Sequence, residues 1–127
     1  MSYHIHLRSN VVYVEFRGET DPYDIISLMR DPVFLPNVRK LGKLIYDFSA
    51  ADEVNLDTGE VQQFAVVAKA ESIFVERLHI VIVLNNPANR ARAQVYKQSL
   101  INTPWQIDIV DALADACDAL SIIDWTR

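Results

Sequence analysis

An aspartate and a threonine flank the polar stretch that follows one apolar segment of the chain. The segment Lys43-Leu-Ile-Tyr-Asp-Phe-Ser49 carries Asp47 near its end, and Asp57-Thr58-Gly59 stands at the start of a helical pattern. In open α/β sheets, ligands and partners usually bind at such a strand-to-helix edge. A carboxylate there could be a reactive group, and a hydroxyl could accept a phosphoryl group.

Asp47 closes an apolar strand, as the phospho-acceptor of response-regulator receivers does. Receivers also carry an acidic pair after their first strand and a lysine after their fifth. Here the first strand runs into a turn at Ser9-Asn10, and Val110-Asp-Ala-Leu offers no lysine. Neither a magnesium ion nor a phosphoryl charge would be held without those groups. We therefore expect Asp47 to accept hydrogen bonds from nearby backbone amides.

Thr58 stands at the predicted N-terminus of a helix, directly after Asp57. A phosphoryl group there would meet the positive end of the helix dipole, which favours modification. The simpler interpretation, which the residues alone favour, is that Asp57 or Thr58 caps the helix.

His4 and His6 share one face of a predicted strand, a spacing that can place two imidazoles on one metal ion. A third ligand would have to be His79 or an acid, and no pattern specifies it. We expect an exposed polar strand face and no metal site.

Two further segments contain residue types that could take part in chemistry. Asn85-Asn-Pro-Ala-Asn-Arg-Ala-Arg92 could contact an anion through free helix amides and its arginines, but it has no glycine-rich approach for a phosphate. Cys117 lies within a predicted buried helical stripe, where a thiolate is disfavoured. The sequence therefore predicts no catalytic residue, no cofactor and no enzyme.

Composition predicts one globular domain spanning residues 1–127. The chain has 12 Lys and Arg against 17 Asp and Glu, and its net charge of −5 argues against nucleic-acid binding. One cysteine permits no internal disulfide, and the N-terminus shows no secretion signal. The longest apolar run, Ile80 to Leu84, is too short to span a membrane. We expect a cytoplasmic protein.

Periodicity predicts an initial β-hairpin that turns at Ser9-Asn10, then a helix that begins at Asp21-Pro22. Residues 33–42 are predicted to form an irregular segment. Leu44 to Phe48 is apolar on both faces and predicts a central strand followed by a loop. Beyond it come a helix from Asp57, a buried strand over 78–84, a helix from Asn86-Pro87 with Ala91 inward, a strand over 105–109 and a helix capped by Asp111. The order is β-β-α-β-α-β-α-β-α, which predicts a single mixed sheet with helices packed on it.

These features together resemble the STAS domains, and most closely the bacterial SpoIIAA-like subgroup of anti-sigma-factor antagonists. In that family a strand ending Asp-Leu-Ser is followed by Asp-Ser-Ser-Gly at the next helix start, where a partner kinase phosphorylates a serine. Asp47-Phe48-Ser49 matches the strand end, and Asp57-Thr58-Gly59 matches the helix start. One hydroxyl, Thr58, stands where the family has two.

The resemblance implies a non-enzymatic regulatory module that binds a protein partner and is switched by phosphorylation at Thr58. Small apolar residues on a polar-rimmed helix face suit a partner contact. The predicted contact residues are Asp47, Ser49, Asp57, Gln62, Val66 and Lys69.

The alternative is a domain that binds a small apolar ligand or a lipid, with the segment 33–41 roofing a pocket. Its lining would include Phe34, Leu35, Val38 and Leu41. Near the C-terminus, Ile122, Ile123 and Trp125 could form a homodimer contact or close the core.

Overall fold

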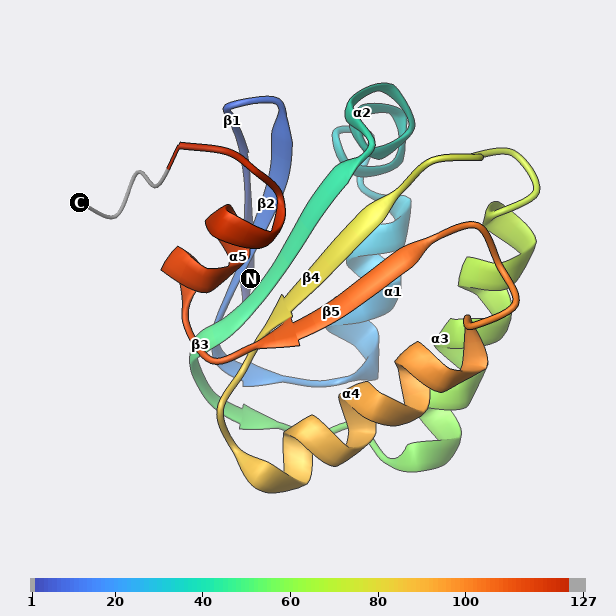
Figure 1. Ribbon diagram of the computed structural model, residues 1–127. Coiled ribbons are helices and arrows are strands. Elements are labelled where there is room, and N and C mark those ends of the chain that lie inside the picture. The colour runs from blue at the N-terminus through green and yellow to red at the C-terminus, as the bar shows by residue number, and fades with distance from the viewer. Residues whose placement is uncertain (1, 124–127) are drawn as a thin grey trace.

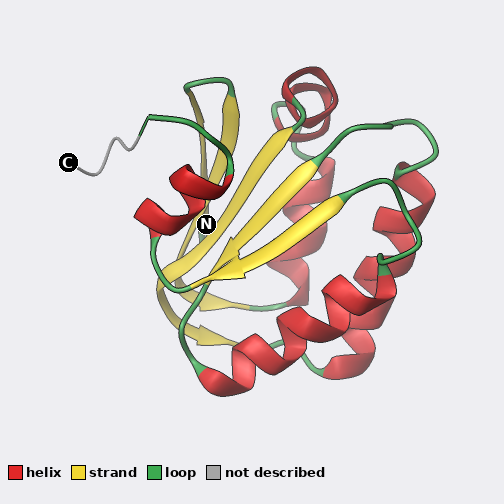
Figure 2. Ribbon diagram, viewed as in Figure 1, coloured by secondary structure: helices red, strands yellow, loops and turns green. Residues whose placement is uncertain are grey.

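A five-stranded sheet carries four helices on one face and a single helix on the other (Figure 1; Figure 2). This arrangement is seen in a computed structural model that describes residues 2–123. The elements are β1 (Tyr3–Arg8), β2 (Val11–Thr20), α1 (Pro22–Arg30), α2 (Phe34–Leu41), β3 (Lys43–Val54), α3 (Thr58–Glu71), β4 (His79–Val83), α4 (Pro87–Ser99), β5 (Gln106–Val110) and α5 (Leu113–Ala119).

The strands lie in the sheet in the order in which they occur in the chain. β1 and β2 are antiparallel, and the pairs β2–β3, β3–β4 and β4–β5 are parallel. The predicted α/β class with one mixed sheet is therefore confirmed, and β3 is its central strand.

Local sequence signals account for several element boundaries. Ser9 and Asn10 both have positive φ angles, 49° and 65°, as a two-residue hairpin turn requires. Asp21 and Asp57 each form a capping box with the residue three positions on, and Asn86 accepts hydrogen bonds from the first amides of α4. The predicted hairpin and these three helix starts are confirmed.

The central strand separates two apolar cores. Leu44, Tyr46 and Phe48 of β3 face the larger core, beneath α1, α2, α3 and α4. Ile45 faces the smaller core, beneath α5. Because strand side chains alternate between faces, each residue of β3 can be assigned to one core or the other.

The segment 33–42 was predicted to be irregular, and this is wrong because residues 34–41 form α2. Pro36 lies in the first turn of this helix, where its missing N–H has no intrahelical acceptor to lose. Gly42 ends the helix in the left-handed conformation, with φ 70°. The chain therefore has two helices between β2 and β3.

The predicted loop after Phe48 is also wrong, because β3 continues to Val54. Its second half pairs with the end of β2, for example Gly18 with Ala51 and Thr20 with Val54, after a shift in register. A long partner strand extends β3 through residues of low strand propensity, which the local sequence does not signal.

Two smaller expectations near the C-terminal half fail. Asp111 does not cap α5, whose N-cap is Ala112; its carboxylate instead accepts a hydrogen bond from Arg90 at 2.7 Å. In α4 the buried alanine is Ala93, whereas Ala91 is exposed. Within residues 2–123, no helix has the length and apolar character needed to cross a membrane.

Candidate functional site

Thr58 is the first residue of α3 and its side chain is exposed. The preceding Asp57 accepts a hydrogen bond from the Glu60 amide at 2.8 Å, and the Glu60 carboxylate accepts one from the Asp57 amide at 3.0 Å. Asp57 is therefore the cap, and the Thr58 hydroxyl takes no part in the capping box. The Thr58 hydroxyl is therefore exposed and available for modification.

A line of exposed side chains runs from Thr58 along α3, which we call the α3 stripe. It consists of Thr58, Gln62, Val66 and Lys69, all of them exposed. Their spacing of four, four and three residues places them on one side of the helix. Val66 is 69% exposed, so an apolar side chain lies in the middle of a polar surface.

Asp47, in contrast, is buried and only 3% exposed. One carboxylate oxygen accepts a hydrogen bond from the Tyr13 hydroxyl at 2.5 Å. The other accepts from the Ser49 amide at 2.9 Å and from the Ser49 hydroxyl at 2.6 Å. The expectation that this carboxylate binds the backbone that follows it is confirmed.

The environment of Asp47 also acts on Tyr13. Burial, and then the hydrogen bond to the Asp47 carboxylate, raise the pKa of the Tyr13 hydroxyl well above its ordinary value. A hydroxyl held protonated in this way is a hydrogen-bond donor at every physiological pH.

The predicted contact residues fall into two groups on opposite faces of the sheet. Asp47 meets Tyr13, a residue of the core beneath α5, and the Ser49 hydroxyl bonds to Asp47 on that side. α3 packs on the other face, through Ala68. Asp47 therefore offers no surface to a partner of α3, and Asp57 with the α3 stripe forms the continuous exposed group.

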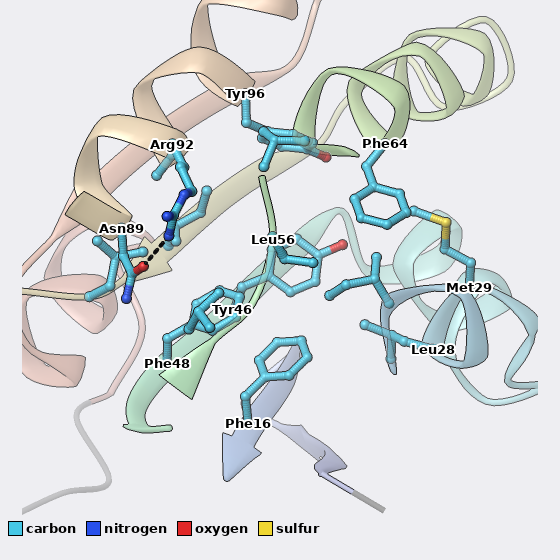
Figure 3. Close-up of a pocket in the computed structure, with 16 residues that line it drawn as sticks. Phe16, Leu28, Met29, Tyr46, Phe48, Leu56, Phe64, Asn89, Arg92 and Tyr96 are labelled. Carbon is cyan, nitrogen blue, oxygen red and sulfur yellow. Dashed lines mark hydrogen bonds between the residues drawn. The ribbon is translucent and has the colours of Figure 1, made fainter. Parts of the chain in front are cut away.

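An apolar cavity of about 100 Å³ lies between the sheet and the helices α1, α3 and α4 (Figure 3). Its walls include Phe16 of β2, Tyr46 and Phe48 of β3, Phe64 of α3 and Tyr96 of α4. Phe16 and Phe48 stack with their ring centroids 4.4 Å apart. The wall is therefore rich in aromatic faces and edges.

This cavity is not the one predicted from the sequence. The lining of the cavity includes none of the predicted residues, which are Phe34, Leu35, Val38 and Leu41. Phe34 and Val38 are only 3% exposed and pack into the larger core as part of α2. Leu41 borders a shallow hollow between the end of α2 and residues 73–77. As a helix packed on the sheet, this segment fills space instead of roofing a pocket.

Polar groups at the cavity come from four side chains, which are Tyr46, Asn89, Arg92 and Tyr96. Arg92 lies on its wall and donates a hydrogen bond to Asn89 at 2.9 Å. Within residues 2–123, Arg92 has no carboxylate partner, and the hydroxyls of Tyr46 and Tyr96 have no hydrogen bond. Burial raises the pKa of both tyrosines above their ordinary value. Sequence reasoning placed Arg92 only in a possible anion contact and did not consider these tyrosines, because no local pattern joins residues from separate elements.

The other residues considered for chemistry lie apart from this cavity. The His6 ring stacks on Tyr13 and lies 3.7 Å from the Glu15 carboxylate. Over residues 2–123, no three His, Cys, Asp or Glu side chains converge as metal ligands do. Ile122 packs against the core beneath α5, and Ile123 is 80% exposed, whereas Trp125 lies outside the described residues.

Comparison with solved structures identifies the fold. The chain is similar to the anti-sigma factor antagonist SpoIIAA in its unphosphorylated form, with a TM-score of 0.58 and 13% sequence identity. The superposition covers 95% of this chain and 99% of SpoIIAA. No family model and no curated protein sequence matches the chain. At this identity the likeness establishes a SpoIIAA-like, STAS-type fold.

Proposed function

We propose that the protein is a non-enzymatic regulatory module that binds a protein partner through the α3 stripe and is switched by phosphorylation of Thr58. The observation that carries the proposal is an exposed, uncommitted hydroxyl at the first position of α3, next to Asp57. The SpoIIAA-like fold, found in an anti-sigma factor antagonist, supports a regulatory role. We place this role in the cytoplasm.

Charge explains how a modification at this position would act. Asp57 and Glu60 already place two carboxylates in the capping box beside Thr58. A phosphoryl group would be favoured by the helix N-terminus and would add further negative charge to this end of the stripe. An acidic partner surface would then be repelled, so phosphorylation would release the partner.

Val66 supplies the apolar part of the proposed contact. Exposed apolar side chains inside a polar rim are typical of partner surfaces. Gln62 and Lys69 flank Val66 on the stripe and supply hydrogen-bonding and charged groups. A charged substitution at Val66 is expected to abolish partner binding without disturbing the core, because this side chain is exposed.

Affinity capture from the source cell, combined with phosphosite mapping, tests partner and switch together. Wild type and Thr58→Ala are expected to retain a common partner that Thr58→Glu and Val66→Glu lose. Gln98→Glu, an exposed position on α4, adds the same charge away from the stripe and should retain it. A Thr58→Glu variant that binds the partner as tightly as wild type would contradict the proposed phosphorylation switch. Homodimerisation through Ile122, Ile123 and Trp125 stays a prediction.

A further inference from the structure

The cavity beneath α1, α3 and α4 has a polar side and an apolar side. In Figure 3, Arg92 and Asn89 of α4 lie across the cavity from Leu28, Met29 and Phe64. A guest that fits both sides must carry an acceptor group at one end and an apolar body at the other.

Arg92 determines which acceptor group fits. Arg92 is a partly buried residue whose guanidinium bonds to Asn89 and has no carboxylate among residues 2–123 to neutralise it. A guanidinium without a neutralising carboxylate favours an anionic partner, and its planar donors match a carboxylate in particular. The guest is therefore expected to bring the carboxylate that the chain does not supply.

The walls and the volume determine the body of the guest. About 100 Å³ approaches the size of an engineered apolar cavity that holds one benzene molecule, roughly 150 Å³. Aromatic rings from β2, β3, α3 and α4 surround this space and favour edge-to-face or offset contacts with another ring. The surroundings therefore favour a single aromatic ring, and the volume limits the apolar body of the guest to no more than one ring.

The hydroxyls of Tyr46 and Tyr96 add a further preference. Neither hydroxyl bonds to another group among residues 2–123. Both residues are only partly buried, and neither hydroxyl is among the fully buried atoms without a partner, so both reach solvent. Each hydroxyl can both donate and accept, so a hydroxyl on the guest could pair with either and gain a hydrogen bond that a purely apolar ring cannot form.

We propose that this cavity is a binding site for a small aromatic carboxylic acid, with its carboxylate on Arg92 and its ring among the aromatic walls. The site lies beneath the helices and is separate from the α3 stripe. It is also distinct from the pocket predicted at residues 33–41. Its lining includes neither Thr58 nor any other residue of the α3 stripe.

Phenylacetate is the probe that tests the site, and 2-phenylethanol is its uncharged counterpart. In calorimetric titrations, phenylacetate is expected to bind with a dissociation constant below about 1 mM, as a ligand of this size can. In NMR spectra, the shifts should centre on the methyl groups of Leu28, Val61 and Leu84, which line the cavity. 2-Phenylethanol should bind at least about tenfold more weakly, because it lacks the charge-assisted hydrogen bonds.

Arg92→Gln is expected to weaken phenylacetate binding by about tenfold and to leave 2-phenylethanol binding unchanged. Lys97→Gln is the matched control, because it removes the same charge from an exposed position of the same helix that does not line the cavity. This control should bind phenylacetate as wild type does. Spectra without probe verify that both variants are folded.

4-Hydroxyphenylacetate is expected to bind more tightly than phenylacetate, and Tyr46→Phe combined with Tyr96→Phe should remove the difference. Three results would overturn the proposed site: no saturable phenylacetate binding up to about 10 mM, which corresponds to negligible affinity; equal affinities in the Arg92→Gln and Lys97→Gln variants; or spectral shifts that lie away from the cavity. A cavity that holds only solvent would give the first of these.

Discussion

Asp47 lies buried between β2 and the residues that follow it in β3, and both of its carboxylate oxygens accept hydrogen bonds. Tyr13 donates to one oxygen and Ser49 to the other. A buried charge of this kind is tolerated only when such donors surround it. At the residue scale, a side chain placed where reactive groups are common thus serves to fix two strands together.

Replacing Asp47 by alanine should lower the free energy of unfolding by about 2–3 kcal/mol, because the buried Tyr13 hydroxyl loses its charged acceptor. Urea denaturation measures the change. Asp52→Ala is the control, since Asp52 is an exposed residue of the same strand, and it should change stability by less than about 0.5 kcal/mol. Equal effects of the two substitutions would contradict the structural role of Asp47.

The raised pKa of Tyr13 has a consequence at alkaline pH. The unfolded tyrosine loses its proton near its ordinary pKa of about 10, whereas the folded residue keeps it. The contribution of this proton to stability is therefore complete below about pH 10 and declines as the pH rises further. Above that pH, Tyr13→Phe should reduce the pH slope of the unfolding free energy by up to about 1.4 kcal/mol per pH unit. Urea titrations between about pH 9 and 11 test this, and an unchanged slope would refute it.

At the element scale, the junction between α2 and β3 depends on a glycine. Gly42 has φ 70°, and a Cβ atom added there would lie 3.2 Å from the Arg77 carbonyl oxygen. Both the left-handed backbone and the close carbonyl disfavour a larger residue. The end of α2 is thereby held against the residues that lead into β4.

Gly42→Ala is expected to destabilise the fold by about 1–2 kcal/mol, more than Gly18→Ala. Gly18 has a similar φ of 66° but no atom within 4 Å of an added Cβ, so it isolates the backbone cost from the contact with Arg77. Thermal and urea unfolding of the two variants provide the comparison. A Gly18 substitution that costs as much as the Gly42 substitution would show that the carbonyl contact adds nothing.

Elements with their own local signals were predictable, and elements that depend on neighbours were not. The hairpin turn and the caps at Asp21 and Asp57 are set by residues within a few positions of one another. α2 is not evident from the sequence, because Pro36 normally signals a break in a helix, although a proline in the first turn costs no hydrogen bond. The extension of β3 depends on β2, more than 30 residues earlier, as the pairing of Gly18 with Ala51 shows.

At the scale of the whole molecule, the two faces of the sheet are covered very unequally. Four helices pack on one face, and α5, with seven residues and no side-chain cap, packs on the other. The cavity arises on the four-helix side, where α1, α3 and α4 meet over β2, β3 and β4. Sequence reasoning could not locate it, because its walls depend on how these separate elements pack.

The unequal covering of the two faces of the sheet predicts that local stability differs between them. The amides of Ile45 and Val81, in β3 and β4, are expected to exchange with solvent only on global unfolding. Those of Ala116 and Cys117 in α5 should exchange at least about tenfold faster, through local opening. Native-state hydrogen exchange followed by NMR measures both. Equal protection of α5 and the central strands would mean that the two layers unfold as one unit.

The sheet order described above has a kinetic consequence. Every strand pairs with the strand that precedes or follows it in the chain. The β1–β2 hairpin closes through a two-residue turn, whereas each parallel pairing must first close a crossover, as between Val12 and Leu44 or between Lys43 and His79. The hairpin is therefore expected to form faster than the parallel pairs. During synthesis, the β1–β2 hairpin emerges first and offers its outer edge to β3, and β4 and β5 can join in turn. The sheet can therefore grow in one direction as the ribosome delivers the chain.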